Sequence, residues 1–286
     1  MLDVLIIGGD SMIGRALATD LMADGLTVSS TSRRADIDAE EIFLDLATPA
    51  TEWPELPTAK TWVIAAAMAR LAACRQDPET SRRVNVIALQ SLAKRAVLQN
   101  AKIIFLSSDQ VFDGSRPHRP ATDSTCPRSE YGRQKAQAEE IILAASADNL
   151  VIRLTKVLSA DDALFTGWRT SLTQGKVITP FTDKTFAPVA LNTVTDGISR
   201  AIAREITGIL QFSGPIDIDY ATAAGYFANH LGFSAEHVLS TAAADAGIPA
   251  EERPAFTSLD TRRTEQTLGL AFARPDELIK QAYAKH

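Results

Sequence analysis

The sequence is poor in the residues from which covalent cross-links and metal sites are built. It has two cysteines, Cys74 and Cys126, in 286 residues, and their spacing forms neither a disulfide framework nor a zinc site. The four histidines are scattered, with no pair at positions i and i+4. We therefore expect reduced thiols in a cytoplasmic protein and no metal cofactor.

The sequence also lacks a long hydrophobic run, an excess of basic residues and a leader-like start. Its most apolar stretch, WVIAAAMA, is too short to cross a bilayer. A net charge of −6 argues against general nucleic-acid binding. The opening MLDVLIIGG carries an acid and runs straight into a strand and glycines, which is typical of a fold rather than of a signal peptide. We therefore expect that the protein binds neither membranes nor nucleic acid.

Small residues follow the first predicted strand, LDVLII. Gly8, Ser11 and Gly14 occupy the three positions of a glycine-rich dinucleotide motif. Small side chains let the backbone turn sharply and approach a pyrophosphate at the N-terminus of the next helix. Serine in the middle position departs from this motif. A turn of this kind alone can be a loop without function, but its place between a strand and an amphipathic helix favours dinucleotide binding.

The second and fourth predicted strands end in residues that suit the two halves of such a cofactor. Arg33 and Arg34 follow LTVSST, where an acid would favour NAD, and guanidinium groups suit a 2′-phosphate. NADP(H) is therefore preferred, with NAD(H) as the alternative. The other interpretation is that these are two solvated surface arginines. After TWVI, the small side chains of Ala65, Ala66 and Ala67 would let a nicotinamide ribose lie close, or serve tight packing.

The stretch from Ser107 to Glu139 carries a constellation suited to acid–base chemistry. Ser108 lies just past the apolar run KIIFL, and Tyr131 and Lys135 are four residues apart on a predicted helix, so both project from one face. An ammonium group near a phenol favours phenolate and lowers the tyrosine pKa from about 10. A serine hydroxyl can hold a carbonyl oxygen while the tyrosine protonates it. Taken alone, Tyr131 and Lys135 could be an ordinary exposed pair.

Apolar strands alternate with helices along the first half of the chain, which predicts an α/β fold with a doubly wound parallel sheet. One long helix is expected from about Pro78 to Leu98, with Val84, Ile87, Ala88 and Leu92 on its inner face. We expect a Rossmann-type dinucleotide-binding domain over residues 1–154, with further elements from about 190–214. Residues 155–286, where the alternation loosens, are expected to form mainly a smaller substrate-binding cap.

Two motifs in this sequence resemble those of a known family. SSDQVFDG and YGRQKAQAE are similar to the S-T-D-x-V-F-D-G and Y-G-x-x-K-x-x-x-E motifs of the dTDP-4-dehydrorhamnose reductases, which are extended short-chain dehydrogenases/reductases. RVNV, DKTFAPV and RPAFTSLD follow in the family's order, so the resemblance covers nearly the whole chain. It implies that Ser108, Tyr131 and Lys135 are catalytic. It also implies cofactor contacts from Gly8, Ser11, Met12, Ile13, Gly14, Arg33, Arg34, Asp45, Leu46, Ala65, Ala66, Ala67, Tyr131 and Lys135, and substrate contacts from Asp109, Val111 and Lys156.

Three positions depart from the family's pattern on the side that would face the sugar. Ile64 stands where the family usually has asparagine, Ala69 where it has a polar residue, and Lys156 where it has tryptophan. A pocket without those hydrogen-bonding and stacking partners cannot discriminate the same substrate well. The hypothesis that follows is that Lys156 favours an anionic group on the substrate.

The resemblance predicts an NAD(P)H-dependent reductase of a keto group on a nucleotide-activated sugar or related small molecule. One alternative is a sugar-nucleotide epimerase or dehydratase that keeps its dinucleotide bound. Another, from a different functional class, is a non-catalytic dinucleotide-binding regulatory subunit of a second enzyme. A homodimer is expected from fold-level analogy only.

Overall fold

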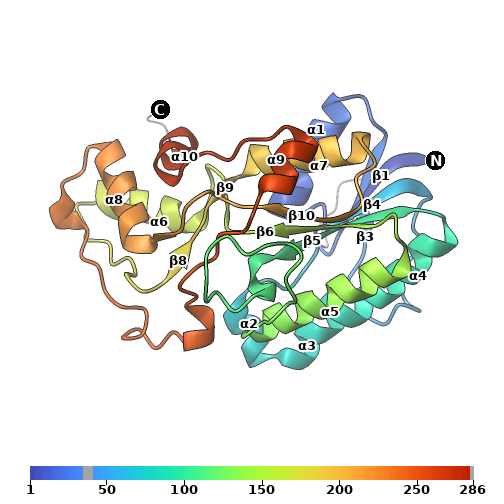
Figure 1. Ribbon diagram of the computed structural model, residues 1–286, viewed down its shortest axis with the longest axis horizontal. Coiled ribbons are helices and arrows are strands. Elements are labelled where there is room, and N and C mark those ends of the chain that lie inside the picture. Colours follow the sequence, from blue (N-terminus) through green and yellow to red (C-terminus); the bar gives the residue numbers. More distant parts are fainter. Residues whose placement is uncertain (35–40, 284–286) are drawn as a thin grey trace. The chain divides into compact units, whose positions relative to one another are not determined.

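The structure, a computed structural model, describes residues 1–34 and 41–283. Its largest sheet has seven parallel strands in the order β10-β6-β5-β4-β1-β2-β3, with helices on both faces (Figure 1). The order reverses between β1 and β4, as in a doubly wound fold, so the fold predicted from the sequence is confirmed. The strands are β1 (Leu2–Ile7), β2 (Val28–Ser32), β3 (Glu41–Phe43), β4 (Ala59–Ile64), β5 (Lys102–Ser108), β6 (Leu150–Leu154) and β10 (Gly208–Phe212).

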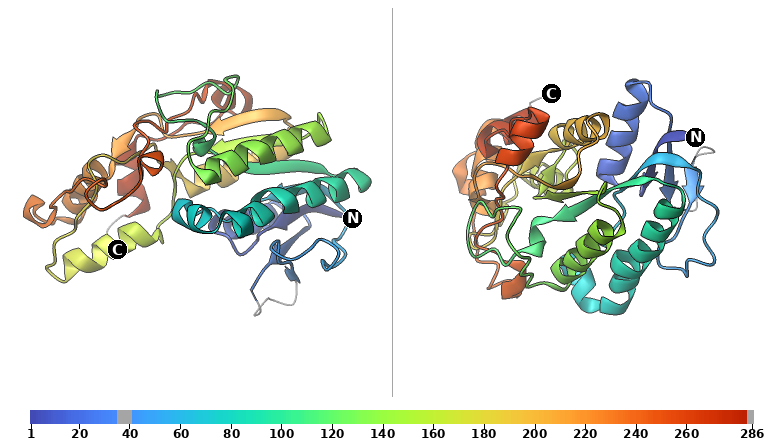
Figure 2. Two further views of the ribbon diagram at one scale, coloured as in Figure 1. Left: turned by 90° about the horizontal axis from the view of Figure 1, so that it is seen from below. Right: turned by 45° about the vertical axis from the view of Figure 1, so that its right-hand side comes forward.

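The inner strands are apolar on both sides because helices cover both faces of a parallel sheet. Ile7, Ile64 and Phe105, from three neighbouring strands, belong to one aliphatic core and are almost fully buried. Helices α1 and α7 lie on one face, while α4 and α5 lie side by side on the other (Figures 1 and 2). The helices are α1 (Met12–Ala23), α2 (Leu71–Gln76), α3 (Pro78–Arg82), α4 (Ala88–Leu98), α5 (Glu130–Ala145) and α7 (Leu191–Ala203).

The long helix expected from Pro78 to Leu98 is interrupted. Between α3 and α4 the chain forms a π-helical turn, Arg83–Ile87. This turn holds an extra residue, which rotates the buried side of the helix. Ile87, expected on the inner face, is therefore 48% exposed, whereas Asn85 and Val86 are buried. The prediction was wrong here because it assumed a constant period of 3.6 residues.

The chain divides into two compact units. The first comprises residues 1–112, 124–153 and 194–210, and the second comprises 113–123, 154–193 and 211–286. The roles predicted for residues 1–154 and 155–286 stay predictions.

The second unit has its own core, in which aromatic side chains pack among aliphatic ones. Phe165 stacks on Tyr283, and Phe227 and Trp168 pack around them. Two short strand pairs lie beside this core. The elements are β7 (Val157–Leu158), paired with β9 (Val189–Ala190), β8 (Thr185–Phe186), paired with β11 (Ile218–Asp219), and helices α6 (Ala163–Thr173), α8 (Tyr220–Leu231), α9 (Arg262–Leu268) and α10 (Pro275–Ala282).

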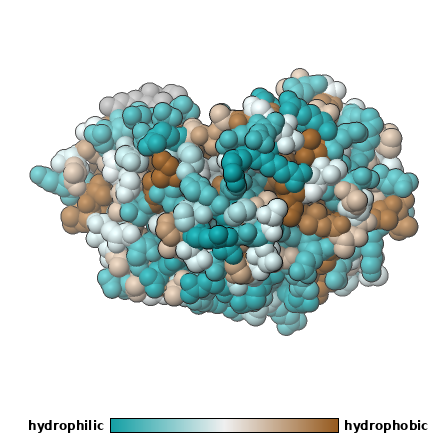
Figure 3. Space-filling model, viewed as in Figure 1, coloured by the Kyte–Doolittle hydropathy of each residue, from teal (hydrophilic) through white to brown (hydrophobic). Residues whose placement is uncertain are grey.

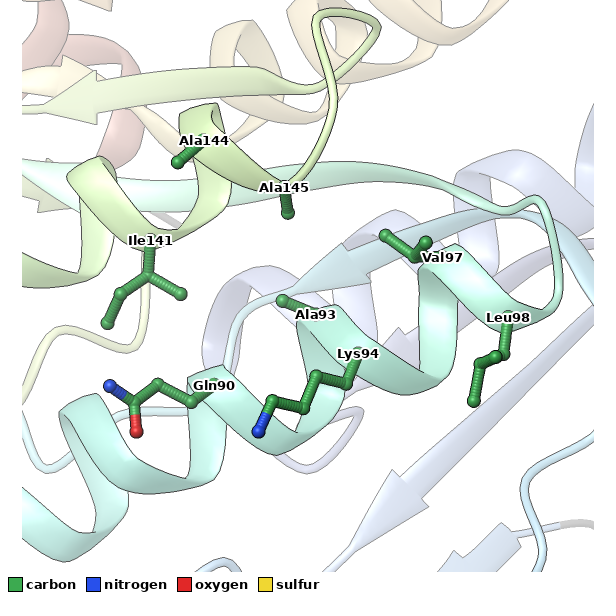
Figure 4. Close-up of a pocket in the computed structure, with 8 residues that line it drawn as sticks. All are labelled: Gln90, Ala93, Lys94, Val97, Leu98, Ile141, Ala144 and Ala145. Atoms are coloured by element: carbon green, nitrogen blue, oxygen red, sulfur yellow. The ribbon is translucent and has the colours of Figure 1, made fainter.

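Hydrophilic side chains predominate on the face shown in Figure 3, with hydrophobic ones in patches between them. Within 1–34 and 41–283, no helix is long and apolar enough to cross a membrane. A groove of about 700 Å³ runs along the outer side of α4 and α5 (Figure 4). Its lining is mainly aliphatic: Gln90, Ala93, Lys94, Val97, Leu98, Ile141, Ala144 and Ala145.

Candidate functional site

The turn between β1 and α1 is so tight that its glycines leave no room for a larger side chain. Gly8 has φ +92°, and a Cβ there would lie 2.7–2.8 Å from backbone and side-chain atoms of Ala66. A Cβ on Gly14 would overlap the carbonyl oxygen of Gly8. The turn is fixed to β2, since the Gly8 amide donates to Oγ1 of Thr31 (3.1 Å) and the Gly9 amide to its carbonyl (2.8 Å).

Ser11, the departure from the glycine motif, caps helix α1. Its Oγ donates to the carbonyl of Gly8 (2.8 Å) and accepts from the amide of Gly14 (3.0 Å). Serine is among the best N-cap residues, so this substitution strengthens the helix start. The first amides of a helix have no partner within it and bind anions readily. A cradle closed to side chains beside a helix N-terminus fits the pyrophosphate of a dinucleotide.

The end of β2 carries two exposed arginines. Arg34 lies beside the glycine turn, with its Nε 3.7 Å from Oδ2 of Asp10, and its side chain is 59% exposed. Arg33 is also exposed. Both are thus accessible to a phosphate, which is compatible with the cofactor role predicted for them and with the surface alternative.

The residues predicted to meet the adenine and nicotinamide ends differ in accessibility. Asp45 accepts the amide of Ala47 (2.9 Å), and Leu46 is buried with the aliphatic core. Ala65, Ala66 and Ala67 follow the end of β4 and are partly buried. The amides of Ala65 and Ala66 both donate to the carbonyl of Ile7 (2.9 Å each), which holds this segment against the end of β1.

The π-helical turn anchors the segment that follows these alanines. Asn85 is buried, its Oδ1 accepts the amide of Met68 (2.9 Å), and its Nδ2 donates to the carbonyl of Met68 (3.0 Å). The same Nδ2 donates to Oε1 of Gln134 on α5 (2.8 Å). Asn85 therefore links the alanine segment to the helix that bears Tyr131 and Lys135. Asn85 was not among the predicted site residues, although it lies in the RVNV motif.

Ser108 and Tyr131 meet at the end of β5, as predicted. Ser108 is the last residue of that strand; its Oγ donates to Oδ1 of Asp109 (3.0 Å) and accepts the amide of Gln110 (3.2 Å). Tyr131 lies in the first turn of α5, is 8% exposed and hydrogen-bonds the Ser108 side chain. Ser129 caps this turn by accepting the amide of Gly132 (3.1 Å), which fixes where the helix begins.

Lys135 lies on the same face of α5 as Tyr131 but donates to a different partner. Its Nζ donates to the carbonyl of Leu106 (2.7 Å) and lies 4.3 Å from the ring centroid of Phe105. The distance from Nζ to the centroid of the Tyr131 ring is 5.8 Å. The ammonium group is therefore held by the strand, one turn of helix beyond the phenol.

Burial, not the lysine, dominates the electrostatics of the phenol. Burial and then the negative charge of Asp109 raise the pKa of Tyr131 above the usual range of phenols, although the hydrogen bond with Ser108 opposes them. Burial also lowers the pKa of Lys135 to about 7, against the opposing charge of Glu139. The pKa of Tyr131 is thus raised overall, and not lowered as the spacing of Tyr131 and Lys135 predicts. The phenol stays protonated at neutral pH, as a proton donor requires.

The three residues predicted to contact substrate do not all present free side chains. Asp109 accepts from Ser108 and from Nε2 of Gln110 (2.9 Å). Val111 is fully buried, so its side chain is a core residue. Lys156 belongs to the second unit, where its Nζ pairs with Oδ2 of Asp162 (2.6 Å). In the described ranges no group of three or more His, Cys, Asp or Glu side chains could hold a metal ion.

A family model, the RmlD substrate binding domain, matches residues 2–286. The chain belongs to this family. A dTDP-4-dehydrorhamnose reductase from Mycolicibacterium smegmatis is 30% identical over 163 residues, which cover 56% of this chain and 47% of the relative. Methionine adenosyltransferase 2 subunit beta from Mus musculus is 30% identical over 152 residues, covering 53% and 46%. These alignments thus span about half the length of the relatives.

Solved structures with this family's fold match along the whole chain. A dTDP-4-dehydrorhamnose reductase from Bacillus anthracis, in complex with NADP, superposes with a TM-score of 0.85 at 16% identity and covers 98% of both chains. At that identity the match establishes the fold alone. It agrees with the seven-stranded parallel sheet and its flanking helices.

Proposed function

We propose that the protein is an NADP(H)-dependent reductase of a keto group on a nucleotide-activated sugar. The meeting of Ser108 and a protonated Tyr131 at the end of β5, with Lys135 one turn along the helix, carries this proposal. Membership of the family supports it, as does the glycine cradle at the start of α1.

In this proposal the residues of the chain position the carbonyl and supply its proton. Ser108 donates a hydrogen bond to the carbonyl oxygen, which requires its hydroxyl to turn from Asp109. Tyr131 protonates that oxygen, and the nearby ammonium of Lys135 stabilises the phenolate that remains. Positioned acid catalysis of this kind contributes about 10²- to 10⁴-fold to the rate.

The glycine turn and the arginines after β2 would hold the dinucleotide. The N-terminus of α1 would bind its pyrophosphate, Arg33 and Arg34 a 2′-phosphate, and the Ala65–Ala67 segment its nicotinamide ribose. When bound, the dinucleotide supplies the hydride, a chemistry that no side chain provides. NADP(H) is proposed over NAD(H) because no acid occupies the position of Arg33 or Arg34.

Tyr131→Phe tests this function directly. The variant keeps the ring in its buried site and removes only the proton donor. We expect NADPH affinity within about threefold of the unchanged protein and a loss of turnover on keto-sugar nucleotides of about 10³-fold or more. Turnover that survives the change would refute the proposed role of Tyr131. Net consumption of NADPH separates a reductase from an epimerase or dehydratase that retains its dinucleotide.

A second candidate function is that of a non-catalytic subunit, suggested by the relative named methionine adenosyltransferase 2 subunit beta. Ser108, Tyr131 and Lys135 are all present and buried together, which favours the enzyme. Inactivity of the unchanged, NADPH-loaded protein across a broad panel of keto-sugar nucleotides would favour the subunit. So would a stable complex with a second enzyme, detected by co-purification from the native source.

Lys156 and its partner Asp162 belong to the proposed substrate side. We propose that Lys156 favours an anionic group on the sugar, with Asp162 holding its ammonium in place. Replacing it by tryptophan, Lys156→Trp, should shift preference toward uncharged sugars. An unchanged ratio of kcat/KM values for acidic and neutral sugar nucleotides would contradict this role.

We further propose that the groove on α4 and α5 binds the same groove of a second copy. Leu98 is 83% exposed and Val97 48%, which is unusual for side chains of this size. A two-fold axis would bring the apolar strip of one copy against that of the other, which removes both from water.

Oligomeric state tests this surface. Sedimentation equilibrium of the full chain should give a dimer, and Val97→Glu/Leu98→Lys should give a folded monomer. Leu239→Lys, at another exposed leucine (58%), is the control and should leave the dimer intact. A monomeric parent protein, or a dimer that survives the double substitution, would contradict the proposal.

A further inference from the structure

Helix α5 contacts strand β5 at three successive points. Tyr131, Lys135 and Glu139 recur every four residues and therefore share one face of the helix. Tyr131 hydrogen-bonds Ser108, and Lys135 donates to the carbonyl of Leu106. Glu139 accepts from the residue between them, because Oγ of Ser107 donates to its Oε1 (2.5 Å). The three polar side chains thus meet three consecutive residues at the end of the strand.

Glu139 is the only one of the three that the proposed reaction does not use, and it is deeply buried. Its side chain is 4% exposed and that of Arg153 on β6 is 3% exposed. Nη2 of Arg153 donates to Oε2 of Glu139 (2.7 Å) and Nε donates to Oε1 (3.0 Å). Such a pair costs much desolvation free energy, and apolar residues of the same volume would often be at least as stable.

Packing alone therefore does not explain why a carboxylate is buried at Glu139. It lies one helical turn from Lys135, whose ammonium is buried among apolar groups and held by one carbonyl. Burial disfavours a charged amine, and the negative charge of Glu139 opposes that effect on the pKa of Lys135. The other titratable groups that face Lys135 are Cys74 from α2 and Tyr131 on its own helix.

We propose that Glu139 is a positioning residue that fixes α5 along β5 through Ser107 and keeps Lys135 in its charged form. Arg153 holds the carboxylate in place and limits its charge. This role rests on the proposed function, since only there does a charged Lys135 beside Tyr131 have a use. It also predicts opposite effects for the two members of the ion pair, which a purely structural pair would not produce.

The titration of Lys135 itself tests this inference without any assay of turnover. The full chain is labelled with [13Cε]lysine, and Lys135→Arg identifies the resonance of Lys135. Glu139→Gln should lower the pH midpoint of that resonance by about one unit, a tenfold loss of proton affinity. Arg153→Met leaves the carboxylate unopposed and should raise the midpoint. Asp196→Asn, which breaks an exposed ion pair with Arg200, is the control and should leave it unchanged.

Both buried variants leave one charge unpaired, so folding is checked by cooperative urea unfolding. If neither variant folds, the doubly substituted Glu139→Gln/Arg153→Met chain, which leaves no unpaired charge, and Glu139→Asp are measured instead. Glu139→Asp keeps the charge and should keep the midpoint within about 0.3 units while lowering kcat, because the shorter side chain alters the position of the helix. In the double variant the two changes oppose each other, and the midpoint should fall by less, because the charge of Glu139 acts on Lys135 more strongly than that of Arg153. A midpoint that stays constant in Glu139→Gln, or that fails to fall in the double variant, would overturn the inference. Absence of turnover in the unchanged protein would refute the proposed function and leave this titration result intact.

Discussion

The ends of β1 and β5 lie in one parallel sheet and are both predicted to serve the same reaction, yet they are constructed in opposite ways. At the end of β1 the chain removes side chains, so that Gly8, Gly14 and Ala66 bring backbone against backbone. At the end of β5 the chain buries polar side chains and gives each a hydrogen-bond partner. Ser107 donates to Glu139, and Lys135 donates to a backbone carbonyl.

The two strand ends therefore tolerate different substitutions. A cradle made of backbone depends on volume, so any added carbon is harmful whatever its chemistry. A site made of buried polar groups depends on partners, so an isosteric change that removes one donor or charge matters more than a change in volume. Substitutions at the two strand ends can separate the effect of added volume from that of a lost partner, and the largest effect is expected at the cradle.

Gly14→Ala should damage the cradle severely, because the added methyl group meets backbone. The new Cβ would overlap the Gly8 carbonyl and lie 2.9 Å from Oγ of Ser11, so backbone must move. We expect a loss of stability of about 3 kcal/mol and no measurable NADPH binding by fluorescence titration. Gly225→Ala, in the open on helix α8, is the control and should stabilise by up to about 1 kcal/mol. Equal effects of the two changes would show that the cradle is not closed to side chains.

Ser108→Ala should spare the fold and weaken catalysis. The Ser108 hydroxyl matters as a hydrogen-bond partner and fills little space. Its loss therefore leaves α5 capped by Ser129 and Lys135 hydrogen-bonded to the strand. Removing one donor to a developing oxyanion costs about 10²- to 10³-fold in kcat. Steady-state kinetics with NADPH saturating would measure this, and Ser146→Ala, at the far end of α5, should change kcat less than twofold. A smaller effect of Ser108→Ala than of the control would remove Ser108 from the mechanism.

Lys135 should make stability depend on pH in a way that the cradle cannot. Its folded pKa of about 7 lies below the ordinary lysine value, 10.5. Between these values the unfolded chain binds the extra proton, so the free energy of unfolding gains a contribution that rises with pH, by up to about 1.4 kcal/mol per unit. Urea unfolding from pH 7 to pH 9 should show this rise, and Lys135→Met should lack about 2 kcal/mol of it. Parallel curves for the two proteins would mean that Lys135 is not perturbed.

The sequence was sufficient wherever a local pattern decides the structure. The apolar strands, the glycine turn and the i, i+4 placement of Tyr131 and Lys135 follow from periodicity and residue size. Periodicity could not predict the π-helical turn at Asn85. In that turn the Asn85 side chain accepts a hydrogen bond from the amide of Met68, which follows β4 and is not a neighbour in the sequence.

The electrostatics of the site lay further beyond the sequence. The predicted spacing of Tyr131 and Lys135 is correct, but the direction of the pKa shift of the phenol depends on burial and on Asp109, which only the folded structure reveals. Glu139 could have been suspected, because it continues the same helical face and the YGRQKAQAE motif ends on it. Its partner Arg153 comes from another strand, so no local pattern predicts the pair.

Arg34→Ala should have the smallest effect and concerns the rim of the cradle, where neither volume nor burial restricts the side chain. Arg34 is mostly exposed and lies beside Asp10. With the dinucleotide bound, the Arg34 guanidinium would pair with both Asp10 and the 2′-phosphate. We expect NADPH affinity to fall about tenfold, close to 1.4 kcal/mol, with NADH affinity unchanged, because only NADPH carries that phosphate. Lys60→Ala is the control, because it removes a positive charge at the start of β4, where Lys60 pairs with Asp3. It should leave the ratio of NADPH to NADH affinity unchanged. Equal losses for both dinucleotides would instead assign Arg34 to the surface, with the cofactor preference set elsewhere.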